Sequence, residues 1–275
     1  MRILIAADME GISGVVHWDH VDSQHKEYAR FRKLMTGDVN AAIEGAYEGG
    51  AEEVIVADGH GNARNILVEE LDPRARLNSG SPSPFAMVQG VDTGIDAAIF
   101  VGYHARVGST NAILDHTWSS TCVANVWLNG ELVGEIGWNS SVCGHFGSPV
   151  IMISGDQTAC AEAKALIGDA IQTAVVKQAR GRMAAECLPP ELSGQKIREA
   201  AARAVRGLRA GQAPQPLRLE APIQVTLELV TSDMADRAAL LPGAKRLEGK
   251  RIEITVDDAT TAYRAFRSAV ALARP

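Results

Sequence analysis

The chain has 275 residues, of which 46% are hydrophobic and 22% charged, a composition typical of soluble globular proteins and not of disordered chains. Its formal net charge is −6, without a dense block of lysine and arginine, which argues against a nucleic-acid surface. No stretch approaches the ~18 consecutive apolar residues of a membrane span, and the apolar run at residues 2–7 is too short for a signal peptide. We therefore expect a cytoplasmic protein that binds neither nucleic acid nor membrane.

Apolar runs alternate with helical patterns in the first part of the chain. The predicted strands cover residues 2–7, 53–57, 97–103 and 149–154. Between the first two, residues 37–48 have a helical pattern that ends at Gly49-Gly50. Because strand and helix alternate, the fold class is α/β, with a mainly parallel sheet flanked by helices.

An antiparallel hairpin interrupts this alternation. Residues 123–128 and 131–136 flank Asn129-Gly130, a strong signal for a two-residue type I′ turn. The pattern therefore predicts a hairpin insertion beside the parallel sheet. After the strand at 149–154, a long helix is expected over residues 158–180.

The C-terminal part looks like a smaller unit. Leu188-Pro189-Pro190 suits a domain junction, and residues 195–210 have a helical pattern. After a short linker, strands are expected at 223–230 and 251–256, with a closing helix over 258–273. We predict an α/β metal-binding catalytic domain over residues 1–190 and a smaller α+β domain over residues 191–275.

The four cysteines show neither a CxxC metal spacing nor a compact disulfide framework. They are Cys122, Cys143, Cys160 and Cys187. We interpret them as reduced and mostly buried thiols, which agrees with the cytoplasm as the expected location.

Residues that bind metals follow three of the predicted strands. Asp8 and Glu10 come after the first strand. His60 comes after the second strand and His104 after the third. In open α/β sheets, ligands bind outside the carboxyl ends of the strands, so these side chains are expected to be neighbours. Two carboxylates and two imidazoles suit Zn²⁺, with Mn²⁺ or Co²⁺ as alternatives.

Each of these residues also has an ordinary structural interpretation. Asp8 alone would cap the following turn, and a single histidine is more often a hydrogen-bonding residue than a ligand. Glu135, on the second strand of the predicted hairpin, is either an exposed edge residue or a buried carboxylate that needs a cation. His17 and His20 have a ligand-like spacing but no strand to fix them. No serine lies in a G-x-S-x-G motif, so nucleophilic catalysis by serine is unsupported.

Five motifs at and near these positions resemble the D-aminopeptidase family of metallopeptidases. They are DMEGISG at 8–14, DGHGNARN at 58–65, GYHA at 102–105, DHT at 115–117 and GEIGWN at 134–139. The resemblance covers most of the chain and is weakest after residue 190. It implies a two-zinc hydrolase that removes the N-terminal residue, a D-amino acid in the known case, from short peptides. It also implies a homo-oligomer, a decameric ring in the known case.

The resemblance further implies a role for each matching residue. The metal ligands would be Asp8, Glu10, His60, His104 and Glu135. Asp8 would bridge the two Zn²⁺ ions, and His116 would be the catalytic residue. Independently of the resemblance, we expect Asp58 and Asp115 to support the ligands through hydrogen bonds.

We therefore predict an aminopeptidase in which two zinc ions activate a water molecule, with short peptides or amino-acid amides as substrates. His116 would donate a proton to the leaving amine or stabilise the oxyanion. The same arrangement of side chains at neighbouring strand ends is compatible with two other functions. A metal-dependent phosphoesterase would have only Arg64 and Arg106 beside the motifs to hold phosphate. A non-catalytic small-molecule-binding protein would need no proton donor.

Overall fold

A seven-stranded sheet forms the centre of the protein in the computed structural model, which describes residues 1–274. The strand order is β3-β2-β1-β4-β7-β8-β9. These strands are β1 (Arg2–Ala7), β2 (Glu53–Asp58), β3 (Ala75–Asn78), β4 (Ala97–Val101), β7 (Val150–Asp156), β8 (Gln172–Gly181) and β9 (Ala184–Cys187). All neighbours pair in parallel except β8 and β9. The predicted mainly parallel sheet is confirmed.

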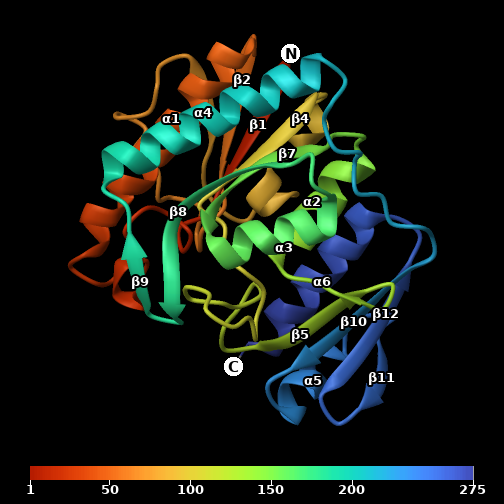
Figure 1. The fold of residues 1–275 in the computed structure, drawn as a ribbon. Helices are drawn as coiled ribbons and strands as arrows, with labels where there is room; N and C mark the ends of the chain where they lie inside the picture. The colour runs from red at the N-terminus through yellow and green to blue at the C-terminus, as the bar shows by residue number, and fades with distance from the viewer. Residues whose placement is uncertain (275) are drawn as a thin grey trace.

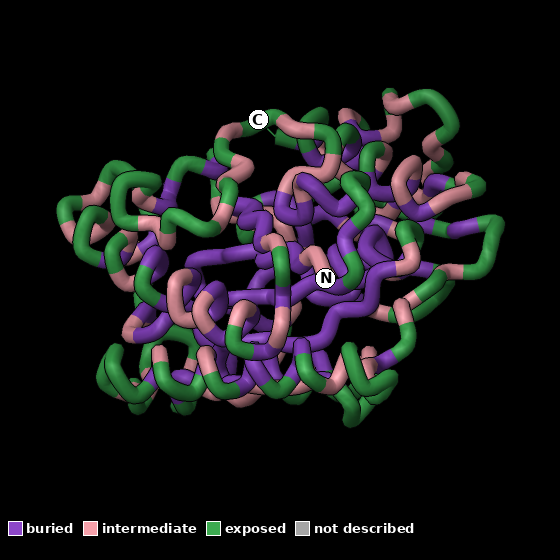
Figure 2. Tube along the Cα trace, turned by 90° about the horizontal axis from the view of Figure 1, so that it is seen from above, coloured by how far each residue is buried: buried purple, intermediate pink, exposed green. Residues whose placement is uncertain are grey.

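Helices cover both faces of this sheet (Figure 1). They are α1 (Tyr28–Gly49), α2 (Glu135–His145), α3 (Gln157–Ile167) and α4 (Pro190–Arg209). Successive residues of a strand point to opposite faces. Ile3 and Ile5 therefore pack in one core with α1 and α4, whereas Leu4 and Ala6 pack in the other with α2 and α3. Figure 2 shows the buried trace of the centre enclosed by partly exposed segments.

A second, antiparallel sheet has the order β11-β12-β10-β5-β6. Its strands are β5 (Val123–Leu128), β6 (Glu131–Leu132), β10 (Ile223–Leu229), β11 (Lys245–Glu248) and β12 (Arg251–Val256). The predicted hairpin around Asn129-Gly130 is present, and both turn residues have positive φ. Two further helices, α5 (Ser232–Ala238) and α6 (Ala259–Ala273), pack on this sheet, and α6 also contacts α2.

Residues before and after the predicted junction near residue 190 pack against each other in two places. Helix α4, which follows the junction, packs along α1. Strand β5, which precedes it, pairs with β10. The division into domains 1–190 and 191–275 therefore stays a prediction, with two extensive contacts between its parts. Within residues 1–274, none of the helices combines the length and the apolar character needed to cross a bilayer.

Two predicted elements are wrong. The helix expected over 158–180 ends at Ile167, because Gly168 takes a φ of 106°, and the residues after it form β8 instead. The strand expected over 131–136 stops at Leu132, and α2 begins at Glu135. Glu135 therefore lies in the first turn of a helix and not on the hairpin, a place where the helix dipole favours a carboxylate.

Candidate metal centre and active site

The first two predicted ligands lie on the loop after β1. Asp8 and Glu10 are both buried, with 2% of each residue exposed. The backbone N–H of Gly11 donates to the carbonyl of Gly102 at 2.8 Å, which holds the loop against the end of β4. A Cβ at Gly11 would lie 2.0 Å from the carbonyl oxygen of Tyr103. Only glycine therefore allows this close approach of two backbones.

A buried lysine on β8 fixes the same loop. Lys177 is 1% exposed, and its Nζ donates to the carbonyl oxygens of Glu10, Ile12 and Val15 at 2.6, 2.9 and 2.7 Å. These bonds use all three ammonium hydrogens, as a buried cation requires. Burial lowers the pKa of Lys177 to about 8. The sequence pattern does not indicate this role, because in a helix over 158–180 Lys177 would be an ordinary surface residue.

His60 reaches the site from the segment after β2. Its Nδ1 lies 3.1 Å from Oε2 of Glu10 and 3.5 Å from Oδ1 of Asp8. Its Nε2 lies 3.0 Å from the carbonyl oxygen of Val21. Since only an N–H can donate to a carbonyl, Nδ1 carries the lone pair in the neutral ring. His60 therefore presents a ligand atom to both carboxylates.

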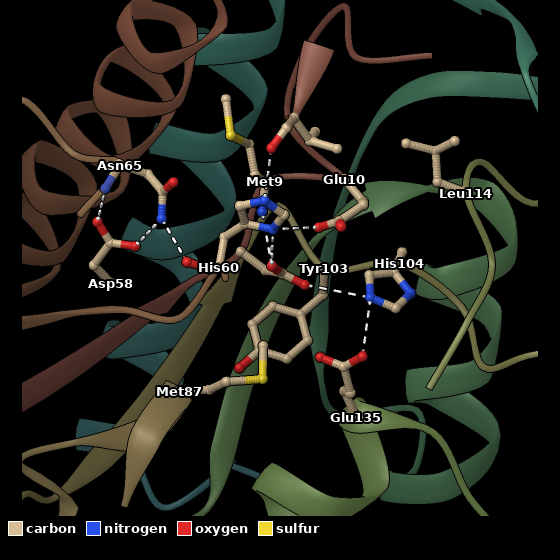
Figure 3. Close-up of polar contacts among 12 residues, drawn as sticks. Met9, Glu10, Asp58, His60, Asn65, Met87, Tyr103, His104, Leu114 and Glu135 are labelled. Carbon is tan, nitrogen blue, oxygen red and sulfur yellow. Dashed lines mark hydrogen bonds and ion pairs between the residues drawn. The ribbon is translucent and has the colours of Figure 1, made fainter. Parts of the chain in front are cut away.

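Asp58 holds the segment that carries His60, in agreement with the supporting role expected for it. Its carboxylate accepts the backbone N–H groups of Asn65 and Ile66 at 2.6 and 2.9 Å. The side-chain Nδ2 of Asn65 donates both to Asp58 and to the carbonyl oxygen of His60, at 2.7 Å each (Figure 3). The backbone at His60 is therefore fixed by a closed set of hydrogen bonds.

His104 and Glu135 approach Asp8 from the other side. The Nε2 of His104 lies 3.4 Å from Oδ2 of Asp8 and 3.3 Å from Oε1 of Glu135. Its Nδ1 lies 2.9 Å from the carbonyl oxygen of Ala105, so Nε2 carries the lone pair in the neutral ring. Oε1 of Glu135 accepts the backbone N–H of Trp118 at 2.7 Å. In Figure 3, the side chains of His104 and Glu135 turn toward each other and lie beside those of Glu10 and His60.

His116 lies beside these residues. Its ring stacks on that of His104 with centroids 4.0 Å apart, and its Nε2 lies 3.7 Å from Glu135 and 3.9 Å from Glu10. Its Nδ1 lies 2.8 Å from the carbonyl oxygen of Leu114, which leaves the Nε2 lone pair directed at the site. Burial lowers the pKa of His116, so the ring is neutral near pH 7. Leu114 has a φ of 50°, a strained conformation of the kind that often marks functional loops.

The chemistry of the cluster fits a cation. Burial and the nearby charge of Glu10 raise the pKa of Asp8 to about 7, because carboxylates that share a buried site repel each other. Among the described residues, Oδ2 of Asp8 and Nε2 of His104 have no hydrogen-bond partner, although they face each other. Two buried lone pairs in this arrangement are unfavourable unless a proton or a metal cation lies between them. Carboxylate oxygen and imidazole nitrogen are the donors that Zn²⁺ accepts.

The predicted residues come together, although their individual roles stay predictions. Two overlapping groups have all their ligand atoms within 4.8 Å of one another: Asp8, Glu10 and His104, and His104, His116 and Glu135. His60 is outside both groups but contacts the first two carboxylates. His116, predicted as the catalytic residue, therefore lies close enough to be a ligand as well.

The cluster opens into a cavity of about 810 Å³. Trp18, Trp118, residues 81–84 and one face of α6 form its other walls. Arg64 and Arg106, the arginines beside the motifs, do not line it, whereas Arg264, Arg267 and Arg274 do. A larger surface hollow of about 950 Å³ lies between α1 and α4, and its lining contains neither histidine nor cysteine. We therefore take the smaller cavity as the functional one.

The other singled-out residues have structural surroundings of their own. His20 stacks on Phe31 with ring centroids 3.9 Å apart, and no group of three potential ligands within residues 1–274 includes it. Asp115, expected to support the site, accepts from Nε of Arg182 at 2.8 Å and from the backbone N–H of Gly108 at 2.7 Å. All four cysteines are free, and only Cys187 is exposed.

A parallel α/β sheet that gathers buried carboxylates and imidazoles at its strand ends, beside a cavity, is typical of a metal-dependent enzyme. Comparison with known proteins gives the family. The family model for D-aminopeptidases matches residues 1–268. A D-aminopeptidase of Bacillus subtilis (strain 168) is 36% identical over 267 residues, which cover 97% of this chain and 95% of that protein. The chain therefore belongs to the D-aminopeptidase family, and it is a metallo-aminopeptidase.

A solved structure agrees with this assignment over nearly the whole fold. It is the Zn-dependent D-aminopeptidase DppA from Bacillus subtilis, described as a self-compartmentalizing protease. The TM-score is 0.94 at 35% sequence identity, and the match covers 99% of this chain and 98% of that one. At this identity and coverage, the likeness supports a common arrangement of elements around the site.

Proposed function

We propose that the protein is a two-zinc aminopeptidase that removes the N-terminal residue, with a D-amino acid as the expected type, from short peptides or amino-acid amides. The observation that carries the proposal is the buried pair of unpartnered ligand atoms on Asp8 and His104. The Zn-dependence of DppA, a neighbour at 35% identity, supports the choice of metal. The D-aminopeptidase of Bacillus subtilis, 36% identical to this chain, supports the D-preference.

The two oxygens of Asp8 support a division of the ligands into two sets. Oδ1 faces His60 at 3.5 Å and Oδ2 faces His104 at 3.4 Å. Glu10 lies on the His60 side and Glu135 on the His104 side. Asp8 would therefore contribute one oxygen to each ion, with Glu10 and His60 in one set and His104 and Glu135 in the other. A carboxylate that bridges two cations neutralises part of both charges.

Bound zinc supplies a Lewis acid and lowers the pKa of water at the site toward neutrality. The protein itself supplies the proton transfers. Nε2 of His116 can take a proton from water and pass it to the leaving amine, because Nδ1 is held by Leu114 and the ring is neutral at rest. Glu10 and Glu135, beside Nε2 of His116, would stabilise the imidazolium that forms between these two transfers.

An aminopeptidase must also recognise a free α-amine. Carboxylates are the acceptors for an ammonium group, and the only ones that line the described part of the cavity are Asp8, Glu10 and Glu135. A substrate that begins at the metal centre would place its amine among them. We also propose a homo-oligomer, with a decameric ring as the expected form, because DppA is described as self-compartmentalizing. The four free cysteines suit the cytoplasm, the location that we propose.

The function is tested by assaying the zinc-loaded protein on L- and D-amino-acid amides, dipeptides and their N-acetylated forms. We expect hydrolysis of the unblocked substrates, loss of activity with a chelator, and poor turnover of the N-acetylated forms. A phosphate ester serves as the matched control for the phosphoesterase alternative. Efficient cleavage of N-acetylated peptides would overturn the aminopeptidase assignment, and cleavage of the phosphate ester alone would favour the alternative.

A further inference from the structure

One face of α6 forms the wall of the cavity that carries positive charge. The residues of α6 that line the cavity include Arg264, Arg267, Ser268 and Ala271, at intervals of three and four that place them on one side of a helix. Arg274 follows just after the helix. Apart from the histidines of the metal centre, these three arginines are the only basic side chains among the described residues that line the cavity, and its acidic side chains all belong to the metal centre. The α6 wall therefore contributes positive charge to the cavity outside the metal centre.

Arg267 is held in this wall by hydrogen bonds and by contacts with aromatic rings. Its NH1 donates to the carbonyl oxygens of Ser83 and Pro84 at 3.0 and 2.8 Å. Its guanidinium lies over the rings of Trp118 and Tyr263, at 5.8 and 5.5 Å from their centroids. Such contacts hold both the arginine and its neighbours in place. Arg267 therefore joins residues 81–84 to α6 and keeps the two sides of the cavity at a fixed separation.

Arg264 differs from Arg267, because the terminal nitrogens of its guanidinium have no partner among the described residues. Its Nε donates to the carbonyl of Thr260 at 3.3 Å. Within residues 1–274 its two terminal nitrogens have no hydrogen-bond partner and no carboxylate within salt-bridge distance. The side chain lines the cavity and is exposed to solvent. A planar guanidinium with two free nitrogens matches the two oxygens of a carboxylate.

We propose that Arg264 binds a carboxylate on the leaving part of a short peptide, while the amine end of that peptide lies at the metal centre. The inference rests on the proposed function and adds the substrate class: zwitterionic short peptides in preference to amino-acid amides or blocked peptides. The arginines support this direction, because they are the cationic side chains of the cavity outside the metal centre and would attract the negative end of a peptide whose amine end lies at the metals. The carboxylate is either the C-terminus of the peptide or an acidic side chain near it.

The test compares an alanyl-alanine dipeptide, in the stereochemistry that the protein cleaves, with the same dipeptide amidated at its C-terminus. A third substrate, an amidated alanyl-glutamate, carries its carboxylate on a side chain.

For the unmodified protein we expect a lower KM for the dipeptide with the free C-terminus than for its amide. In Arg264→Gln the ratio of the two kcat/KM values should fall about tenfold, through KM, since hydrogen bonds to charged groups contribute on this scale. Arg264→Lys should retain part of the preference. The unmodified protein could also prefer the third substrate to the amidated dipeptide. If Arg264→Gln removes that preference as well, an acidic side chain is an alternative source of the carboxylate.

Arg237→Gln is the matched control, since Arg237 pairs with Asp233 on α5 and does not line the cavity. It should leave the ratio unchanged, and unchanged melting of each variant excludes unfolding. Equal use of the free and amidated dipeptides by the unmodified protein, or an unchanged preference in Arg264→Gln, would overturn the proposal. If no peptide or amide were cleaved, the proposed function would fail instead. Calorimetric binding of the free dipeptide, with and without Arg264, would then still decide the role of this arginine.

Discussion

The two sides of the cavity are built in opposite ways. On the metal side, the loop after β1 is buried and tied from two directions, by the ammonium group of Lys177 and by the carboxylate of Asp38, which accepts both the N–H and the Oγ–H of Ser13. On the α6 side, Arg264 is exposed and makes one long hydrogen bond. Catalysis needs groups fixed to within a fraction of an ångström. An exposed arginine, in contrast, can be substituted without disturbing the packing of the core. We therefore propose that the chemistry belongs to the rigid side and the substrate selectivity to the exposed side.

The largest expected effect on the rigid side comes from His116→Ala. Removal of a proton-transfer group should lower kcat by about 10²–10⁴-fold, while the ligands around Asp8 keep their positions. Zinc content, measured on the same preparation, should stay at the value of the unmodified protein. His116→Gln keeps a polar group of similar size and serves as the second variant. A parallel fall of zinc content and activity would make His116 a ligand, which its distances to the other ligand atoms allow.

Lys177→Met tests the hydrogen bonds that hold the loop after β1, which carries Asp8 and Glu10. The variant keeps the length of the side chain but leaves three buried carbonyl oxygens without a donor, so we expect about 3 kcal/mol lower stability and weaker zinc binding. Denaturant unfolding gives the stability, and the visible absorption of the cobalt-loaded protein reports the ligand geometry. Lys164→Met, at an exposed position on α3, is the control. Unchanged stability and cobalt spectrum in Lys177→Met would show that the loop holds its shape without the lysine.

Asp258→Ala should have the smallest effect and concerns the exposed side. Asp258 caps the N-terminus of α6 and accepts the hydroxyls of Thr260 and Thr261 at 2.6 Å each. These hydrogen bonds lower the pKa of its carboxyl group, so its contribution is present above the unfolded pKa of about 3.9 and is lost as the pH falls further. We expect a loss of about 1 kcal/mol at pH 7. An equal loss at pH 7 in Asp169→Ala, an exposed position after α3, would show that the cap is not responsible.

The parallel sheet and the convergence of ligands could be predicted because they follow from local patterns. Strands such as β1 and β4 are apolar runs, and the residues after them are brought together by the rule for parallel strands. Glu135 shows the limit of such patterns. The side chain reaches the predicted centre, but from the first turn of α2, since nothing in the alternation of residues 131–136 indicates where the strand stops.

Interactions between distant segments could not be predicted. Lys177 contacts a loop more than 160 positions away in the chain, and its burial follows only once residues Gln172–Gly181 form a strand. The helix predicted over 158–180 concealed this, because the prediction ran through Gly168 although glycine has a low helix propensity. The position of Arg264 in the same cavity as the metal centre likewise depends on the packing of α6 against α2, a contact that no single segment specifies.

The central claim is that Asp8 joins two metal ions at the rigid side of the cavity. The most direct measurement is the zinc content of the purified protein and of Asp8→Ala, determined together with the hydrolysis of an amino-acid amide. We expect about two zinc ions per chain in the unmodified protein, and loss of both ions and of turnover in the variant, because a bridging carboxylate balances two cations at once. The control Asp236→Ala, at a surface ion pair with Arg246, should keep both. Full zinc content in Asp8→Ala would contradict the account.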